Sequence, residues 1–258
     1  MTQDPTNITA SAEDPAPGMA TPPSRLDLVM ERHPEVPYVA PFMTFLLLMA
    51  LGSFFEGPAH VPWLYTLRTI GALLVSLLCW KYWPPLGKAH ILPAVVFGLA
   101  VALMWVAVHK VFAAQNWYPY TQLLGRDAPL EKHYDCFAQL GSGVALWLFL
   151  IVRIGGASIV VPIVEEIFWR GFVLRLLIDH WRFERVPLGA YTLRSFIICS
   201  LLSAAEHPMW EVGILCWVVF NLLFYWKKSL LFLMVTHGVT NFALYVYVVL
   251  VRDWVFWS

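Results

Sequence analysis

Long apolar runs alternate with short polar connections along most of the chain. The runs lie at roughly 38–55, 62–80, 90–113, 141–178, 195–206, 211–226 and 229–251. About 20 apolar residues let one helix cross a bilayer, and fewer suffice where protein shields the helix from lipid. Because backbone exposed to lipid must satisfy its own hydrogen bonds, the pattern predicts an all-α membrane bundle of seven or eight transmembrane helices.

The fourth run, residues 141–178, is too long for one straight passage through a bilayer. Gly155, Gly156 and Pro162 are the positions at which this run is expected to kink or break. The pattern alone leaves open whether the run crosses the membrane once or twice.

The first 35 residues differ from the rest of the chain. Residues 1–35 are polar and rich in proline, and they lack the apolar core of a signal peptide. They are therefore predicted to form a disordered tail. Residues 36–258 are expected to form a single integral membrane domain, with the chemically interesting motifs gathered between about residues 140 and 250.

Basic residues in the connections predict the orientation of the bundle. These residues are Lys81, Lys88, Arg182, Arg185, Arg194, Lys227 and Lys228. Lys and Arg favour cytoplasmic loops. All seven face the cytoplasm together if the N-terminus is cytoplasmic and residues 141–178 cross once.

Composition supports a bilayer as the surroundings of this chain. Of its 258 residues, 59% are hydrophobic and only 13% are charged, whereas soluble domains are about 25% charged. A formal net charge of zero argues against nucleic acid as a partner. The four cysteines show no CxxC spacing, so no disulfide framework is indicated.

A few charged residues interrupt the apolar runs. Glu165 and Glu166 are adjacent, and Arg170 follows Glu166 by four residues, so Glu166 and Arg170 share one helical face in the order that favours an ion pair. Glu165 is rotated away by about 100° and needs another partner. Arg68 is expected to extend its charge toward the membrane surface. Arg153 is expected to have a structural partner.

Two further apolar runs carry polar groups. His207 precedes Pro208, which disfavours helix at His207, so this histidine is expected at a helix break that lines a cavity. His237 and Asn241 are four residues apart and therefore face the same way on a helix. Each group alone suits packing between helices, but all three motifs together supply the groups that hydrolysis requires.

These residues predict water-mediated hydrolysis at membrane depth. Glu165 would deprotonate a water molecule with assistance from His207, and the hydroxide would attack an amide carbonyl. His237 and Asn241 would donate to the developing oxyanion. In a second version, Glu165, His207 and His237 would bind a divalent ion such as Zn²⁺, although the HExxH zinc signature is absent.

Two other classes of function fit the same residues. A non-catalytic membrane scaffold or immunity-type protein would keep the polar core for packing alone. A transporter would use buried Glu and His as a proton relay. Transporters often show inverted repeats or paired broken helices, and this sequence shows no internal repeat.

The polar motifs resemble those of the type II CAAX prenyl endopeptidase family, which also includes bacteriocin-processing proteins. The family's EExxxR, FxxxH and HxxxN motifs correspond in order to Glu165, Glu166 and Arg170, to His207, and to His237 and Asn241. The first position of FxxxH is Ser203 instead of phenylalanine. Because that position suits packing, the substitution is expected to affect the shape of the pocket and not the activity.

The resemblance implies an intramembrane protease that acts on a protein or peptide. Eukaryotic members remove the last three residues of prenylated proteins, but this specificity is not carried over to the present chain. Members are described as metallopeptidases, and a glutamate–histidine mechanism without metal is also argued. The motif context looks most like the bacterial branch associated with exosortase systems, which implies the inner, or plasma, membrane of a bacterium.

Overall fold

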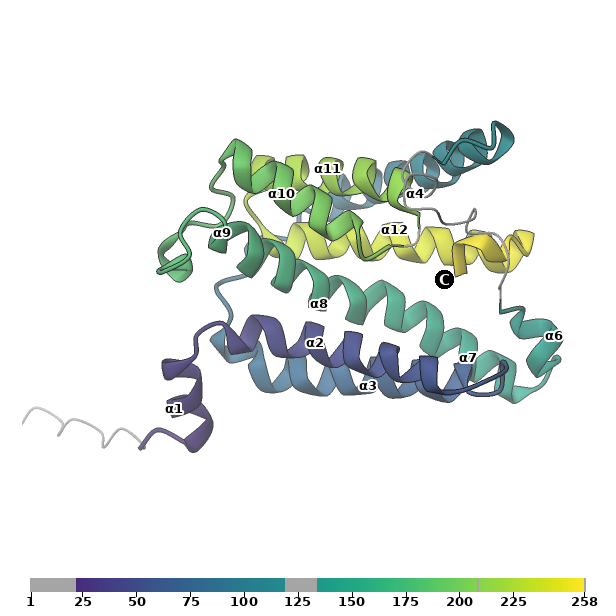
Figure 1. Cartoon of the computed structure of the whole chain (residues 1–258), viewed down its shortest axis with the longest axis horizontal. Helices are drawn as coiled ribbons and strands as arrows, with labels where there is room; N and C mark the ends of the chain where they lie inside the picture. The colour runs from purple at the N-terminus through teal and green to yellow at the C-terminus, as the bar shows by residue number, and fades with distance from the viewer. Residues whose placement is uncertain (1–21, 119–133, 208, 258) are drawn as a thin grey trace, which may run out of the picture.

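The computed structural model describes residues 22–118, 134–207 and 209–257. Regular structure in these ranges is helical and contains no strand, which confirms the all-α fold class. In chain order the helices are α1 (Arg25–Arg32), α2 (Val36–Ala50), α3 (Val61–Cys79), α4 (Ile91–Ala114), α6 (Cys136–Leu140), α7 (Val144–Gly155), α8 (Val161–Glu166), α9 (Leu174–Leu176), α10 (Leu193–Ala204), α11 (Trp210–Lys227) and α12 (Leu230–Val251). Most of them run along the long axis of the molecule (Figure 1).

Four helical segments of the described ranges are long and apolar enough to cross a membrane. They are Val61–Tyr82, Ile91–Ala114, Val144–Leu176 and Leu230–Val251. Helices α2 and α10 are apolar but shorter. The chain is therefore an integral membrane protein, while the count of seven or eight spans remains a prediction.

The long fourth run forms one continuous helical segment. Val144–Leu176 comprises 33 residues, so at about 1.5 Å per residue it is about 50 Å long, well beyond the 30 Å core of a bilayer. Two π-helical stretches, Gly156–Val160 and Ile167–Val173, flank α8 within it. The predicted irregularity is therefore present, but the segment does not turn back on itself (Figure 1). Such π-helical turns are frequent at functional sites.

Close backbone contacts hold α12 in the middle of the bundle. A Cβ atom at Gly98 of α4 would lie 2.7 Å from the Thr236 carbonyl oxygen. On the opposite side, Gly238 of α12 lies directly against the Ser158 carbonyl. Because neither glycine has a side chain, α12 fits between α4 and the Gly156–Val160 stretch. These two contacts fix where His237 lies along α8.

Basic connections meet at one end of the bundle. The Ser229 hydroxyl donates to the carbonyls of Leu86 and Lys88 at 3.1 and 2.8 Å. A Cβ atom at Gly189 would meet the side chain of Lys228. These contacts join the connections before α4, before α10 and before α12.

The predicted N-terminal tail contains a helix. Ser24 and Asp27 form a capping box at the start of α1, and Lys81 Nζ, just after α3, donates to Asp27 Oδ1 at 2.7 Å. The prediction of disorder for residues 1–35 therefore missed α1, because composition reveals neither a cap nor a contact with a distant helix. Residues 1–21 lie outside the described ranges.

Two arginines inside the apolar runs contact the ring of one tyrosine, Tyr65. Arg153 donates to the Trp257 carbonyl and its Cζ lies 4.2 Å from the Tyr65 ring centroid, so the predicted structural partner exists. Arg68 does not follow its prediction. Its Cζ lies 4.4 Å from the Tyr65 ring and 5.0 Å from the Phe45 ring, because these aromatic faces hold the guanidinium inside the bundle.

Candidate functional site

Three parts of the chain bring the polar motifs together. The segment from α8 into the next π-helical stretch carries Glu165, Glu166 and Arg170. The connection between α10 and α11 carries His207, and α12 carries His237 and Asn241. Side chains from all three parts line one cavity of about 200 Å³. The helices that converge here are separated by tens of residues in sequence.

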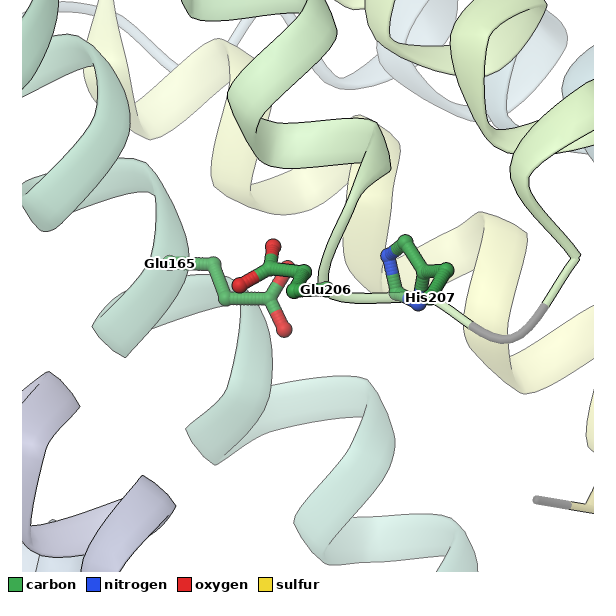
Figure 2. Close-up of side chains that lie close together, drawn as sticks. All are labelled: Glu165, Glu206 and His207. Carbon is green, nitrogen blue, oxygen red and sulfur yellow. The ribbon is translucent and has the colours of Figure 1, made fainter. Parts of the chain in front are cut away.

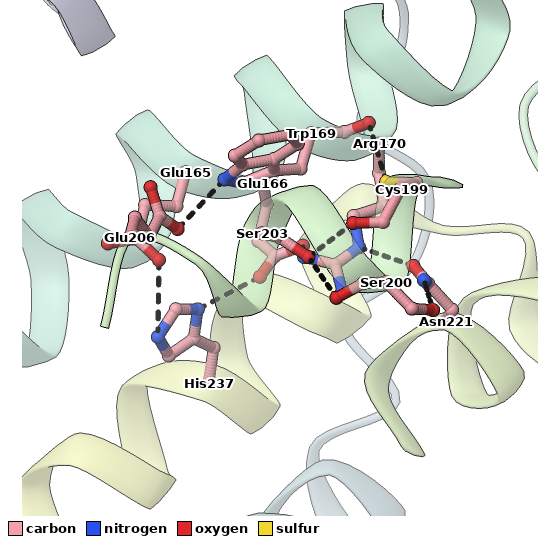
Figure 3. Close-up of polar contacts among 10 residues, drawn as sticks. All are labelled: Glu165, Glu166, Trp169, Arg170, Cys199, Ser200, Ser203, Glu206, Asn221 and His237. Carbon is pink, nitrogen blue, oxygen red and sulfur yellow. Dashed lines mark hydrogen bonds and ion pairs between the residues drawn. The ribbon is translucent and has the colours of Figure 1, made fainter. Parts of the chain in front are cut away.

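Glu166 lies at the centre of a buried ionic contact. Its Oε2 lies 3.0 Å from Arg170 Nη1, and its Oε1 lies 2.9 Å from His237 Nδ1 (Figure 3). Glu166 and Arg170 are fully buried. The contact predicted from their spacing is therefore confirmed. Because a buried charge is stable only when it is paired and hydrogen-bonded, this cluster holds α8 and α12 together.

The network continues from Arg170 to two further helices. Arg170 Nε donates to Asn221 Oδ1 of α11 at 2.9 Å, and Asn221 Nδ2 donates to the Ser200 hydroxyl of α10 at 2.9 Å. The Arg170 guanidinium also lies 4.4 Å from the centroid of the Trp217 ring. Sequence reasoning missed Asn221, and a signal was available, since it is an isolated amide within an apolar run.

Glu165 points away from Arg170 and into the cavity. Its carboxylate, that of Glu206 and the His207 imidazole form a group whose candidate ligand atoms all lie within 4.8 Å of one another (Figure 2). His237 Nε2 lies 3.9 Å from Glu165 Oε2. The two adjacent acids thus occupy different surroundings, because a step of one residue around the helix turns Glu165 toward the cavity.

Glu206 belongs to this site although the sequence motifs did not assign it a role. The Trp169 indole donates from Nε1 to Glu206 Oε1 at 2.9 Å, which anchors the carboxylate beside Glu165. An acid next to His207 at the end of an apolar run was the available signal. Its approach to Glu165 depends on the placement of α10 against the long helix.

His207 lies at the predicted helix break. Helix α10 ends at Ala204, and the His207 amide donates to the Ala204 carbonyl at 3.1 Å. The imidazole is nearly parallel to the Trp217 ring, with centroids 5.7 Å apart and an interplanar angle of 18°. The Trp105 and His207 rings form a T-shaped pair, with centroids 5.7 Å apart. These rings fix the orientation of the imidazole at the cavity wall.

Asn241 has a structural contact as well as a place in the cavity wall. Its Nδ2 donates to the Ala157 carbonyl at 2.8 Å, within the Gly156–Val160 stretch. This hydrogen bond joins α12 to the π-helical stretch. An amide nitrogen carries two N–H groups, so one remains for a molecule in the cavity.

The residues that would suit a metal ion differ by one from the predicted set. Glu165 and His207 belong to both sets, but Glu206 takes the place of His237 in the close group. His237 is drawn aside because its Nδ1 contacts Glu166. Two carboxylates and one imidazole are ligand types that zinc accepts. Ligands about 2.0–2.2 Å from zinc lie about 3.4 Å from one another, so the group fits an ion after small side-chain shifts.

Comparison with known proteins agrees with the motif assignment. Residues 144–243 match the family model described as type II CAAX prenyl endopeptidase Rce1-like. The matched segment begins at the start of α7 and ends two residues after Asn241, so it contains every motif residue named above. No curated protein and no solved structure matches the chain. Over residues 144–243, this chain is therefore similar to the type II CAAX prenyl endopeptidase Rce1-like family.

Proposed function

We propose that this protein is an intramembrane endopeptidase that hydrolyses a peptide bond in a protein or peptide substrate. One observation carries the proposal. Glu165, Glu206 and His207 converge at a cavity, whereas the neighbouring acid Glu166 is engaged by Arg170 and His237. The similarity of residues 144–243 to a protease family model supports the same reaction. A polar core kept only for packing would not require a second acid facing a cavity.

The first step is attack by water on the scissile carbonyl. Glu165 accepts a proton from a water molecule that His207 orients, and the water oxygen bonds to the carbonyl carbon. The π electrons of the carbonyl move to its oxygen, which becomes an oxyanion. The Trp217 and Trp105 rings hold the His207 imidazole in place for this role.

His237 and Asn241 are the proposed donors to that oxyanion. A single donor of this kind is worth about 2.7–4 kcal/mol in transition-state stabilisation. Because His237 Nδ1 contacts Glu166, His237 can donate from Nε2 only in the imidazolium form. Asn241 donates through the N–H that Ala157 does not use.

Collapse of the tetrahedral intermediate completes the reaction. The electron pair on the oxyanion restores the carbonyl, the C–N bond breaks, and the leaving nitrogen takes the proton that Glu165 received. The products are a carboxylic acid and an amine, so atoms and charges balance. This route requires no covalent enzyme intermediate.

A zinc-dependent version of the site uses the same cavity. Glu165, Glu206 and His207 would hold the ion, which when bound would polarise the carbonyl and acidify water. Elemental analysis of the purified full chain separates the versions. Zinc at one equivalent, lost in Glu206→Gln, supports the metal version, while activity without bound metal supports the glutamate–histidine version.

We also propose a bacterial plasma membrane as the location, with the N-terminus in the cytoplasm. The contacts between the connections that carry Lys88 and Lys228 support this orientation, because they gather basic residues at one end of the bundle. Single cysteines introduced at these two positions should react with an impermeant maleimide only after the membrane is opened. Labelling of either position in intact cells would overturn the orientation.

The reaction itself is tested by Glu165→Gln, which removes the base and keeps the shape of the side chain. Proteins in membrane fractions of cells that carry wild-type or Glu165→Gln protein are compared by mass spectrometry. Glu184→Gln is the matched control because Glu184 is exposed and remote from the cavity. We expect substrate fragments to disappear only in Glu165→Gln, while that variant remains folded in detergent.

Two outcomes favour the competing functions. Full biological activity of folded Glu165→Gln would refute the protease and favour a scaffold. Loss of folding in Glu165→Gln, with no fragment that depends on the wild-type protein, would favour a purely structural polar core. A proton flux that Glu165→Gln abolishes without any change in fragments would favour a transporter.

A further inference from the structure

The cavity has a positively charged side chain that the proposed reaction does not use. Arg68 of α3 lines the same cavity as Glu165 and His207. Its guanidinium rests on the faces of Tyr65 and Phe45, and its Nε is buried without a hydrogen-bond partner. Contact through the flat face leaves the N–H groups at the edge of the guanidinium available to a ligand.

No acidic side chain neutralises this arginine in the described part of the chain. The ion pairs found there involve other residues. The other cation at the Tyr65 ring is Arg153, whose Cζ lies 4.2 Å from the ring centroid and which donates to the Trp257 carbonyl. Two guanidinium groups therefore share one aromatic ring, and like charges in such surroundings favour an anion nearby.

A carboxylate is the anion that best suits both this side chain and a peptide. The guanidinium forms two parallel N–H···O bonds with a planar carboxylate. A peptide offers carboxylates at its C-terminus and on Asp or Glu side chains. We propose that Arg68 is a carboxylate-binding subsite of the cavity, which selects peptides with a carboxylate close to the bond that is cut. The position of this subsite next to a scissile bond rests on the proposed function, whereas binding of a carboxylate at Arg68 does not.

Binding is tested apart from cleavage, with the full chain in detergent carrying Glu165→Gln. The probes are N-acetyl tetrapeptides of apolar residues with a benzophenone group for photo-crosslinking. One set ends in a free carboxylate, one ends in an amide, and one ends in an amide but carries a glutamate. Cross-linked protein is quantified with and without Arg68→Gln, and intrinsic tryptophan fluorescence on heating checks that each protein is folded.

We expect a carboxylate-bearing set to be captured about 10- to 100-fold more tightly than the neutral amide, the range for hydrogen bonds to charged groups. Arg68→Gln should remove that preference, and Arg68→Lys should retain part of it. Arg194→Gln, which removes an exposed positive charge away from the cavity, should leave the preference unchanged. Comparison of the free C-terminus with the glutamate set identifies the source of the carboxylate.

Equal capture of all three sets, or capture of none, by the protein with Arg68 intact overturns the proposal even if Arg68→Gln fails to fold. Competition by phosphatidylglycerol but not by phosphatidylcholine, without any preference among peptides, would assign Arg68 to lipid phosphate and also overturn it. A carboxylate preference that depends on Arg68 stands even if Glu165→Gln leaves fragments in cells unchanged. In that case the protease proposal fails and the binding site remains.

Discussion

Replacement of Arg170 by methionine tests whether the buried ionic cluster stabilises the bundle. Methionine replaces the aliphatic part of the arginine side chain with an unbranched apolar chain, and the positive charge is removed. Glu166 would then retain the His237 imidazole as its side-chain partner, with Nδ1 at 2.9 Å from Oε1. Asn221 and the Trp217 ring would lose their contacts with the guanidinium as well.

The size of the effect follows from burial. Glu166 and Arg170 have no exposed surface, and removal of one partner from a buried ion pair costs about 3–5 kcal/mol in soluble proteins. Hydrogen bonds between membrane helices average only about 0.6 kcal/mol, because the unfolded chain in the membrane also finds partners. Arg170 contacts Glu166 of α8 and both Asn221 and Trp217 of α11, so we expect a loss of about 2–4 kcal/mol in the free energy of unfolding.

The assay is reversible unfolding in mixed micelles with increasing SDS, followed by tryptophan fluorescence. The double variant Arg170→Met/Glu166→Gln is the essential comparison, because it removes the charge that Arg170→Met leaves behind. We expect the double variant to regain at least 1 kcal/mol relative to Arg170→Met, as replacement of both partners is often nearly neutral. Arg175→Met, also buried but paired with backbone carbonyls, controls for loss of a guanidinium.

Two results would refute this reasoning. A loss below about 0.6 kcal/mol for Arg170→Met would show that the cluster contributes no more than an average contact between membrane helices. A double variant less stable than Arg170→Met would show that the remaining Glu166 charge is not the source of the loss. Either result would leave the cluster with a role in function alone.

Three further predictions concern other parts of the chain. Gly98→Ala should lower the free energy of unfolding by about 1–3 kcal/mol, because its Cβ would lie 2.7 Å from the Thr236 carbonyl and α12 would have to shift. Burial raises the pKa of Cys136 to about 11, so its thiol should resist maleimide at pH 8 until the protein unfolds. The hydrogen bond from Lys81 holds the pKa of Asp27 below its ordinary value. Docking of α1 should therefore be stable above about pH 4 and weaken as the pH falls further. Limited proteolysis at residues 25–32 measures this loss. Lys81→Met should make the loss smaller, because it removes the largest of the contacts that lower the pKa of Asp27.

The sequence by itself determined the class of protein and the residues of the candidate site. Apolar runs of span length require helices, because lipid offers no partner for the backbone. The spacing of Glu166 and Arg170 fixed their contact, since residues four apart meet on any α-helix whatever surrounds it. The helix break at His207 followed from local chain chemistry in the same way.

Contacts between helices were decided only by the tertiary structure. Glu206 reaches Glu165, and Asn221 reaches Arg170, across separate helices. Arg68 turns into the cavity and not toward the membrane surface because Tyr65 and Phe45 hold its guanidinium there. Helix α1 is held by Lys81, which lies 54 residues from Asp27 in sequence.

The physical reason is the difference between local and distant geometry. Backbone hydrogen bonds within one helix fix the relative direction of side chains a few residues apart, so a spacing in the sequence is enough to predict them. The rotation and height of one helix against another depend on close packing over its whole length, as at Gly98 and Gly238. The sequence therefore named most of the polar residues of this site, whereas packing determined which of them face the cavity together.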